Sequence, residues 1–170
     1  MPKAKNSNID TAPETLPIDA PMRRRLPPLL RRAWFSMNQA LRRRILHLEI
    51  TPDQFTALRI LGETEGKGLS QRELTELMSS DPNTVASLVE RMETNGLLQR
   101  NPHEKDKRAH RIKLLAKGKR VYAAARAEAV QLQKEILAAL PPERCDPFLE
   151  ELTLVADACR RAAEGSTRRE

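Results

Sequence analysis

Aromatic residues and cysteines are scarce in this chain. Only 3% of its 170 residues are aromatic, which argues against the platform of exposed rings that holds single-stranded nucleic acid. Two cysteines allow at most one disulfide, so we expect a reducing, cytoplasmic location rather than a secreted disulfide scaffold. Long apolar runs and an apolar signal segment are also missing, and we therefore expect no membrane partner.

Motifs of catalysis are missing as well. The sequence has no His-Glu-x-x-His pair, no glycine-rich phosphate loop and no nucleophile elbow around a serine. Its three histidines do not stand at metal-ligand spacing, and His103 and His110 are more consistent with phosphate or solvent contacts. We expect neither an enzyme nor a bound metal or cofactor.

Positive charge is what the chain has in excess, and it is unevenly distributed. The net charge is +7. Residues 23–48 contain eight arginines and no acid, and residues 96–120 contain nine bases and two acids, whereas residues 49–95 carry nine acids and four bases. Two basic blocks of this kind attract polyanions. The alternative is that they are ordinary solvated helix faces.

The N-terminal part changes character after a run of prolines. Six of the twelve prolines lie in the first 28 residues, and we interpret residues 1–25 as a disordered tail. Residues 26–50 are predicted to form a helix. Its apolar residues recur every three or four positions on one stripe, which consists of Leu30, Trp34, Met37, Leu41, Ile45 and Leu48.

Residues 51–115 carry start and stop signals of short helices. Thr51 with Gln54, and Ser70 with Glu73, have the spacing of reciprocal capping boxes. Asp81 followed by proline predicts the start of a further helix, and the Asn-Gly pair at 95–96 predicts its left-handed end. Residues 97–100 and 111–115 then lose the helical period and are predicted to pair as a hairpin around a polar tip.

Residues 116–164 are predicted to form two more helices. The first runs to about residue 140, where two consecutive prolines break it. The second has an apolar seam at spacings of three and four, formed by Cys145, Phe148, Leu152, Val155 and Cys159. We expect residues 165–170 to fray.

These elements predict a mainly α fold with a small β-hairpin wing. Residues 69–115 have the order helix, tight turn, helix, hairpin, which is typical of a winged helix-turn-helix. Such a unit suits double-stranded DNA, because a helix fits the major groove and a thin cationic loop can follow phosphates or enter the minor groove.

The same stretch resembles the MarR-type winged-helix regulators. The residues that carry the resemblance are 84–93, then 95–100 with Gly-Leu, then Asp-Lys-Arg at 106–108, and 112–114. Over about residues 28–162, the resemblance implies a homodimer that joins through the first and the last two helices. It also implies a transcriptional regulator, often a repressor, that is released by a small anionic aromatic ligand or by thiol oxidation. Ser87 stands where many members carry arginine, and Leu115 where a capping threonine is usual, so we expect the next helix to start without a side-chain cap.

Candidate DNA contacts lie on the second helix of the motif and on the wing. Asparagine, serine and threonine can read base edges, whereas arginine and lysine contact phosphate. Asp106 would repel phosphate, so we expect it to orient Arg108 or a nearby base, so that Lys107 or Arg108 enters the minor groove. Asp81 is better explained as a helix cap. The candidates are Asn83, Thr84, Ser87 and Arg91 on the helix, and Lys105, Asp106, Lys107, Arg108, His110 and Arg111 on the wing.

Two further sets of residues bear on regulation. The resemblance implies a ligand pocket formed by Trp34, Met37, His47 and Phe55, although core packing explains its apolar members as well. Cys145 and Cys159 invite a redox interpretation. They lie fourteen residues apart and cannot bridge within one straight helix, and an apolar seam is a common place for an inert cysteine.

The sequence thus predicts a homodimeric, sequence-specific regulator that binds double-stranded DNA at a pseudo-palindromic operator, with recognition helices roughly 34 Å apart. We expect a repressor relieved by a small-molecule effector. The alternatives are a thiol-responsive regulator and a winged-helix module that binds protein instead of DNA.

Overall fold

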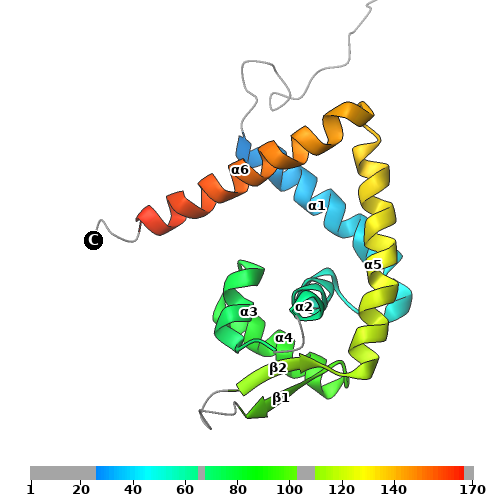
Figure 1. Cartoon of the computed structure of the whole chain (residues 1–170), viewed down its shortest axis with the longest axis vertical. Coiled ribbons are helices and arrows are strands. Elements are labelled where there is room, and N and C mark those ends of the chain that lie inside the picture. Colours follow the sequence, from blue (N-terminus) through cyan, green and yellow to red (C-terminus); the bar gives the residue numbers. More distant parts are fainter. Residues whose placement is uncertain (1–25, 65–67, 103–109, 167–170) are drawn as a thin grey trace, which may run out of the picture. The chain divides into compact units, whose positions relative to one another are not determined.

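The computed structural model of the chain describes residues 26–64, 68–102 and 110–166. The tail predicted at 1–25 lies outside the described residues. By its internal contacts the chain divides into two units, Met1–Ala40 and Leu41–Glu170. Within the described ranges the structure is mainly helical with one two-stranded hairpin, as predicted (Figure 1). Its elements are α1 (Leu26–Arg44), η2 (Leu46–Leu48), α2 (Pro52–Glu63), α3 (Gln71–Met78), α4 (Pro82–Thr94), β1 (Leu98–Pro102), β2 (His110–Leu114), α5 (Ala116–Leu137) and α6 (Pro142–Ser166).

The first helix is shorter than its apolar stripe predicted. α1 ends at Arg44, and the chain continues through the 3₁₀ turn η2 rather than as α-helix to Leu48. The turn ends at Glu49, which adopts a left-handed conformation with φ 55°. Ile45 is fully buried and Ile50 is 6% exposed. The end of the helix therefore places two isoleucines in one core, which a continuous helical stripe would not do.

The predicted caps of α2 and α3 are confirmed. The backbone N–H of Thr51 donates to Gln54 Oε1 at 2.9 Å, and the N–H of Gln54 donates to Thr51 Oγ1 at 3.2 Å. In the same way Ser70 N–H donates to Glu73 Oε2 at 2.7 Å, and Glu73 N–H to Ser70 Oγ at 3.2 Å. Each box satisfies two backbone donors that a helix start leaves unpaired.

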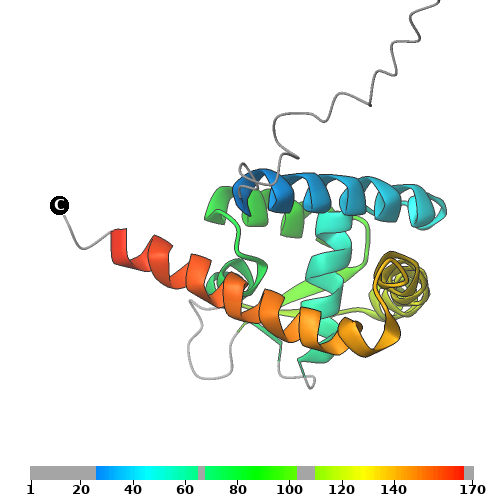
Figure 2. The same cartoon turned by 90° about the horizontal axis from the view of Figure 1, so that it is seen from above.

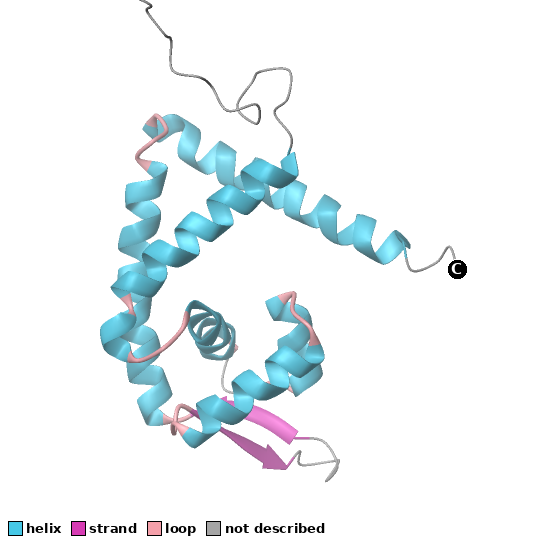
Figure 3. Cartoon of the chain, turned by 180° about the vertical axis from the view of Figure 1, so that it is seen from behind, coloured by secondary structure: helices cyan, strands magenta, loops and turns pink. Residues whose placement is uncertain are grey.

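α2, α3 and α4 pack on one another and on the hairpin, and Figure 3 shows them grouped beside the two strands. We call this unit, residues 51–115, the winged lobe. Its interior is apolar, because the 3.6-residue period of each helix turns its branched side chains inward. The largest fully buried side chains of the lobe are Leu58, Leu74, Val85, Val89, Met92, Leu98 and Ile112.

The wing strands pair antiparallel, with Arg100 opposite Ile112 in the register. Each strand is shifted slightly from the prediction, to Leu98–Pro102 and His110–Leu114. Leu69 adds a short bridge on the other side of β2: its N–H donates to Ile112 O at 3.1 Å, and Ile112 N–H donates to Leu69 O at 2.7 Å. The residues just before α3 are thereby joined to the wing.

α5 packs directly against the winged lobe at its first turn. As predicted, Leu115 precedes it without a side-chain cap. A Cβ on Gly118 would lie 2.0 Å from the carbonyl oxygen of Leu97, so this contact requires glycine. Further along, the Tyr122 hydroxyl donates to Glu63 Oε1 at 3.2 Å, and burial together with the nearby Glu63 carboxylate raises the pKa of Tyr122. α5 ends at Leu137, three residues before the predicted end.

α6 follows α5 after the short segment 138–141. Figure 2 shows it in orange and red, and it differs from every helix of the winged lobe. None of its described side chains is buried. Its exposed apolar residues include Phe148, Leu152 and Leu154, with exposed fractions of 39%, 37% and 68%. α6 extends to Ser166, so the predicted fraying does not start at residue 165, and 167–170 lie outside the description. Throughout the described ranges, each helix is too short or too polar to cross a membrane.

Candidate nucleic-acid interface

α4 presents one apolar and one polar face. Its apolar residues Val85, Leu88, Val89 and Met92 are buried in the lobe. On the other side, all four residues predicted to contact DNA are exposed, and three of them lie in the first two turns: Asn83, Thr84, Ser87 and Arg91. The helix therefore offers amide and hydroxyl groups first and one cation further along. Base edges can be read by the former and phosphate can be contacted by the latter.

Asp81 caps the start of α4, as predicted from its position before Pro82. Its Oδ1 accepts the backbone N–H groups of Asn83 at 3.1 Å and Thr84 at 2.9 Å. Hydrogen bonds from Thr84 are the main cause that lowers the pKa of this carboxyl group. Two N–H groups at the start of α4 are thus occupied by a carboxylate, which leaves side chains to make the contacts on this face.

α4 ends as predicted. Gly96 has a positive φ of 67°, and its N–H donates to Glu93 O at 2.9 Å while Leu97 N–H donates to Met92 O at 2.9 Å. This pair of bonds is a Schellman motif. Near this end Arg91 folds back along the helix, where its Nε donates to Ser87 O at 3.2 Å.

Of the wing, the structure describes the two strands β1 and β2. Its predicted tip contacts lie in residues 103–109, outside the described residues: Lys105, Asp106, Lys107 and Arg108, together with His103. His110 is exposed at the start of β2. Arg111, also predicted to contact DNA, has partners within the lobe: its Nη1 donates to Gly68 O and to Glu73 Oε2, each at 3.1 Å.

A second arginine of the wing is held in a similar way. Arg100 in β1 donates its backbone N–H to Glu93 Oε1 and its Nε to Glu93 Oε2, both at 2.9 Å. These bonds lower the pKa of Glu93, the backbone N–H of Arg100 being the largest cause. Neither arginine–glutamate pair was predicted from the sequence. The spacing of Glu93 and Arg100, seven residues apart across a helix end, is not a recognised local pairing signal.

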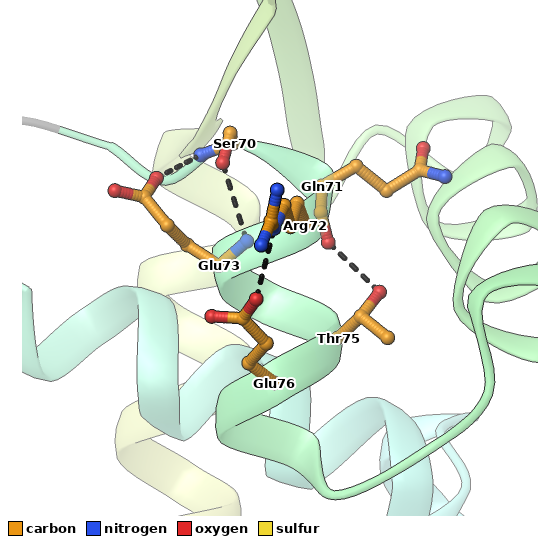
Figure 4. A network of polar contacts seen from close by, with 6 residues as sticks. All are labelled: Ser70, Gln71, Arg72, Glu73, Thr75 and Glu76. Atoms are coloured by element: carbon orange, nitrogen blue, oxygen red, sulfur yellow. Dashed lines mark hydrogen bonds and ion pairs between the residues drawn. The ribbon is translucent and has the colours of Figure 1, made fainter. Parts of the chain in front are cut away.

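The start of α3 is a network of short polar contacts (Figure 4). Besides the Ser70–Glu73 box, Thr75 Oγ1 donates to Gln71 O at 2.8 Å. Arg72 Nε donates to Glu76 Oε1 at 3.0 Å, one turn further on. The side chain of Arg72 is 89% exposed, so this pair is screened by solvent. α3 therefore begins with a well-ordered turn directly beside the residues that hold β2.

The residues predicted to form a ligand pocket divide between the two units. In Met1–Ala40, Trp34 and Met37 are exposed on α1, at 61% and 45%. In the other unit His47 is exposed in η2, whereas Phe55 is 8% exposed and stacks on Tyr122 with 6.4 Å between ring centroids. Phe55 is thus accounted for by the core of the lobe.

The two cysteines are unpaired thiols on one helix. Cys145 is half-buried, and its Sγ lies 3.6 Å from both Leu137 O and Pro141 O. Cys159 is exposed near the other end of α6. Neither cysteine packs in the core of the winged lobe.

The chain is similar to known regulators in sequence and in fold. A family model described as the MarR family matches residues 50–110. The transcriptional regulator HosA of Escherichia coli O127:H6 is 30% identical over 102 residues, which are 60% of this chain and 74% of HosA. The PcaV regulator of Streptomyces coelicolor, solved with its natural ligand, is 27% identical with a TM-score of 0.69, covering 79% of this chain and 93% of PcaV. The Staphylococcus aureus MepR–DNA complex has the same fold, with a TM-score of 0.73 at 21% identity over 79% of this chain and 98% of MepR.

Proposed function

The chain belongs to the MarR family, and from that premise we propose that it is a homodimeric repressor of a pseudo-palindromic operator, relieved by a small anionic aromatic ligand. It is a DNA-binding transcriptional regulator. The observation that carries the proposal is the exposed polar face of α4, which stands on a lobe whose apolar side is buried.

We assign sequence choice to the first two turns of α4. Asn83 can pair bidentately with adenine, and the hydroxyls of Thr84 and Ser87 can donate to or accept from several base edges. Arg91 supplies a phosphate contact. On the wing, Lys105, Lys107, Arg108 and His110 complete the contact set, with Asp106 orienting Arg108. These wing contacts add affinity and register rather than sequence choice.

The apolar surfaces of α1 and α6 support the homodimer. Trp34 and Phe35 on α1 are 61% and 55% exposed, and α6 carries a seam on which Phe148 and Leu152 stay exposed among the described residues. Amphipathic helices in soluble proteins bury their apolar stripe against another surface. A second copy of the chain supplies that surface in the dimer that we propose.

An anionic ligand is supported by the basic end of α1 and by the family premise. Arg42 and Arg43 are exposed there, close in sequence to His47. The related PcaV was solved with a natural ligand. A ligand relieves repression only if it binds the DNA-free conformation more tightly than the DNA-bound one.

The proposal is tested first by selecting bound fragments from the genome of the source organism with the purified full-length chain. We expect one or a few duplexes with two inverted half-sites, bound by a dimer. The logarithm of the affinity should fall steeply and linearly with the logarithm of the salt concentration, because bound phosphates release counterions. A chain that stays monomeric at micromolar concentration, or that binds no duplex in dilute salt, contradicts the proposal and favours a protein-binding module.

Two variants then test the contact assignment on the selected operator. Asn83→Ala should reduce the preference for the operator over unrelated DNA at an unchanged salt slope. Arg91→Ala should weaken binding to all duplexes and reduce the magnitude of the slope by about one. Benzoate, with uncharged benzyl alcohol as its control, tests the ligand class: we expect the acid to lower operator affinity and the alcohol to have no effect.

A further inference from the structure

We propose that Arg100 and Arg111 are positioning residues that hold the wing on the helix-turn-helix through Glu93 and Glu73. This inference rests on the proposed function, because the position of the wing matters for DNA binding. We call the pairs Glu93–Arg100 and Glu73–Arg111 the wing braces. By sequence, Arg111 is one of the cations of a DNA-binding wing; its contacts give it a different role.

The first brace joins β1 to the end of α4. Glu93 is the next-to-last residue of α4, and its two carboxylate oxygens bind one residue of the wing, at the backbone N–H and at the Nε of Arg100. β1 is an edge strand of the two-stranded sheet. The carboxylate therefore satisfies an edge N–H that the ladder leaves unpaired, and it sets both the position and the rotation of the strand.

The second brace joins β2 to the start of α3. Glu73 Oε2 accepts from Arg111 Nη1 at 3.1 Å and from the N–H of Ser70 at 2.7 Å. One oxygen thus serves both the cap of α3 and the wing. The same Nη1 also reaches Gly68 O at 3.1 Å, beside the backbone bridge between Leu69 and β2.

Together the braces attach each strand to a different helix of the DNA-binding motif. β1 is fixed to the end of α4 and β2 to the beginning of α3, so the hairpin cannot rotate about one attachment without breaking the other. The residues that follow, at the wing tip, are the ones we assign to DNA. The braces therefore set the direction of the two strands, Leu98–Pro102 and His110–Leu114, between which the wing tip lies in the sequence.

The braces are half-exposed, so we expect them to position the wing without adding much to the stability of the protein. The side chains of Arg100 and Glu93 are 34% and 38% exposed, and those of Arg111 and Glu73 are 31% and 46% exposed. Half-exposed ion pairs contribute little to the free energy of unfolding. Variants of the braces should therefore fold, and a loss of DNA binding will report the position of the wing.

The experiment measures operator affinity against salt concentration for full-length Arg111→Gln, Glu73→Gln and the double variant. Glutamine at position 73 keeps the oxygen that caps α3. We expect each single variant to lose about tenfold in affinity at an unchanged salt slope, and the double variant to bind no more weakly than either. Arg91→Gln is the matched control and should lower the magnitude of the slope by about one.

A direct DNA contact by Arg111 predicts the opposite pattern. Removing the negative charge of Glu73 would then strengthen binding, and Arg111→Gln would reduce the magnitude of the slope by about one. Either result overturns the brace. Equal thermal midpoints for wild type, Glu73→Gln and Arg111→Gln are required alongside, because a large drop would show that the pair acts on the fold as a whole.

A readout without DNA separates failure of the brace from failure of the proposed function. Amide hydrogen exchange of Arg100 should accelerate at least tenfold in Glu93→Ala, since the acceptor of that N–H is removed, while exchange of the Val89 amide inside α4 should stay unchanged. Unaltered exchange at Arg100 overturns the first brace. The wild type could bind no operator while the amide exchange of Arg100 still accelerates in Glu93→Ala. The proposed function would then be wrong, and the contact between Glu93 and Arg100 would be confirmed.

Discussion

The winged lobe and α6 use similar apolar residues in opposite ways. In the lobe, Leu58, Leu74 and Met92 are completely buried. In α6, leucines of equal size are exposed, Leu152 at 37% and Leu154 at 68%. The lobe shares one buried core with Ile45, Ile50 and Ala125 of the same chain, whereas α6 has an apolar seam that no described part of the chain buries. The difference indicates that the core around the lobe is completed within one chain, and it supports our proposal that a second copy covers the seam of α6.

α5 is buried near its start and exposed near its end. Near its start Gly118 and Ala125 are buried against the lobe. Towards its end Ile136 is 45% exposed, and on the same turn the Arg44 side chain pairs with Glu135. Hydrogen bonds from Arg44 and Gln131 lower the pKa of that carboxyl group. α5 therefore packs on the lobe at one end, and we assign its other end to the proposed dimer surface.

The comparison is tested most strongly by removing one buried leucine. Leu58→Ala should lower the free energy of unfolding of the lobe by about 3 kcal/mol, because it creates a cavity in a closed core. Leu154→Ala, its matched control in α6, should change that free energy by less than about 0.5 kcal/mol. Chemical denaturation followed by helix content measures both. Equal losses in the two variants would contradict the division into a closed core around the lobe and an exposed helix.

The partner dependence of α6 is tested by placing a charge on its seam. Leu152→Asp should weaken the dimer at least 100-fold, about 2.7 kcal/mol, since a carboxylate would have to be buried without a counter-charge. Leu154→Asp lies off the seam and should leave the dimer intact. Sedimentation over a range of concentrations distinguishes the two. A dimer that survives Leu152→Asp would place the interface elsewhere.

The close packing of α5 on the lobe predicts a difference between two glycines. Gly118→Ala should destabilise the protein by about 2 kcal/mol, because the new methyl group meets the carbonyl oxygen of Leu97 at 2.0 Å. Gly165→Ala is the control in α6, where nothing lies within 4 Å of the added carbon. Its thermal midpoint should be unchanged or slightly higher.

The smallest expected effect is a pH dependence of stability that arises from two carboxyl groups of the lobe. The pKa values of Asp81 and Glu93 are both lowered by hydrogen bonds in the folded state. Their contribution to stability is therefore present above the ordinary carboxyl pKa of about 4 and is lost as the pH falls through the lowered values. Asp81→Asn keeps a capping side chain but does not titrate, so its stability should fall less between pH 5 and pH 2 than that of wild type. An identical decline would exclude Asp81 as a source.

Local signals predicted the starts and ends of several elements correctly. The capping boxes at Thr51 and Ser70, the Asp81 cap and the Gly96 stop each involve residues no more than a few positions apart. Such contacts are satisfied within one helical turn, so they can be recognised before anything is known of the fold. The exposure of the four predicted contact residues on α4 follows in the same way from the period of the helix.

Non-local contacts were not predictable in this way. Arg111 had the appearance of a free wing cation, although it binds Glu73, which lies 38 residues earlier in the chain. The stripe of the first helix continued through Ile45 and Leu48, but α1 stops at Arg44 because the core of the lobe takes Ile45. In both cases the competing group comes from a distant segment that a local pattern does not contain.

The linear order of residues was sufficient to specify the helices, their caps, the wing and the polar face of α4, since backbone donors near a helix start and side chains on one face are settled by neighbours within a turn. Which arginines pair with carboxylates, and which apolar stripes are buried, depended on folding. These outcomes require surfaces from distant segments to meet, and an apolar stripe has the same spacing whether it faces a core, as in α4, or solvent, as in α6.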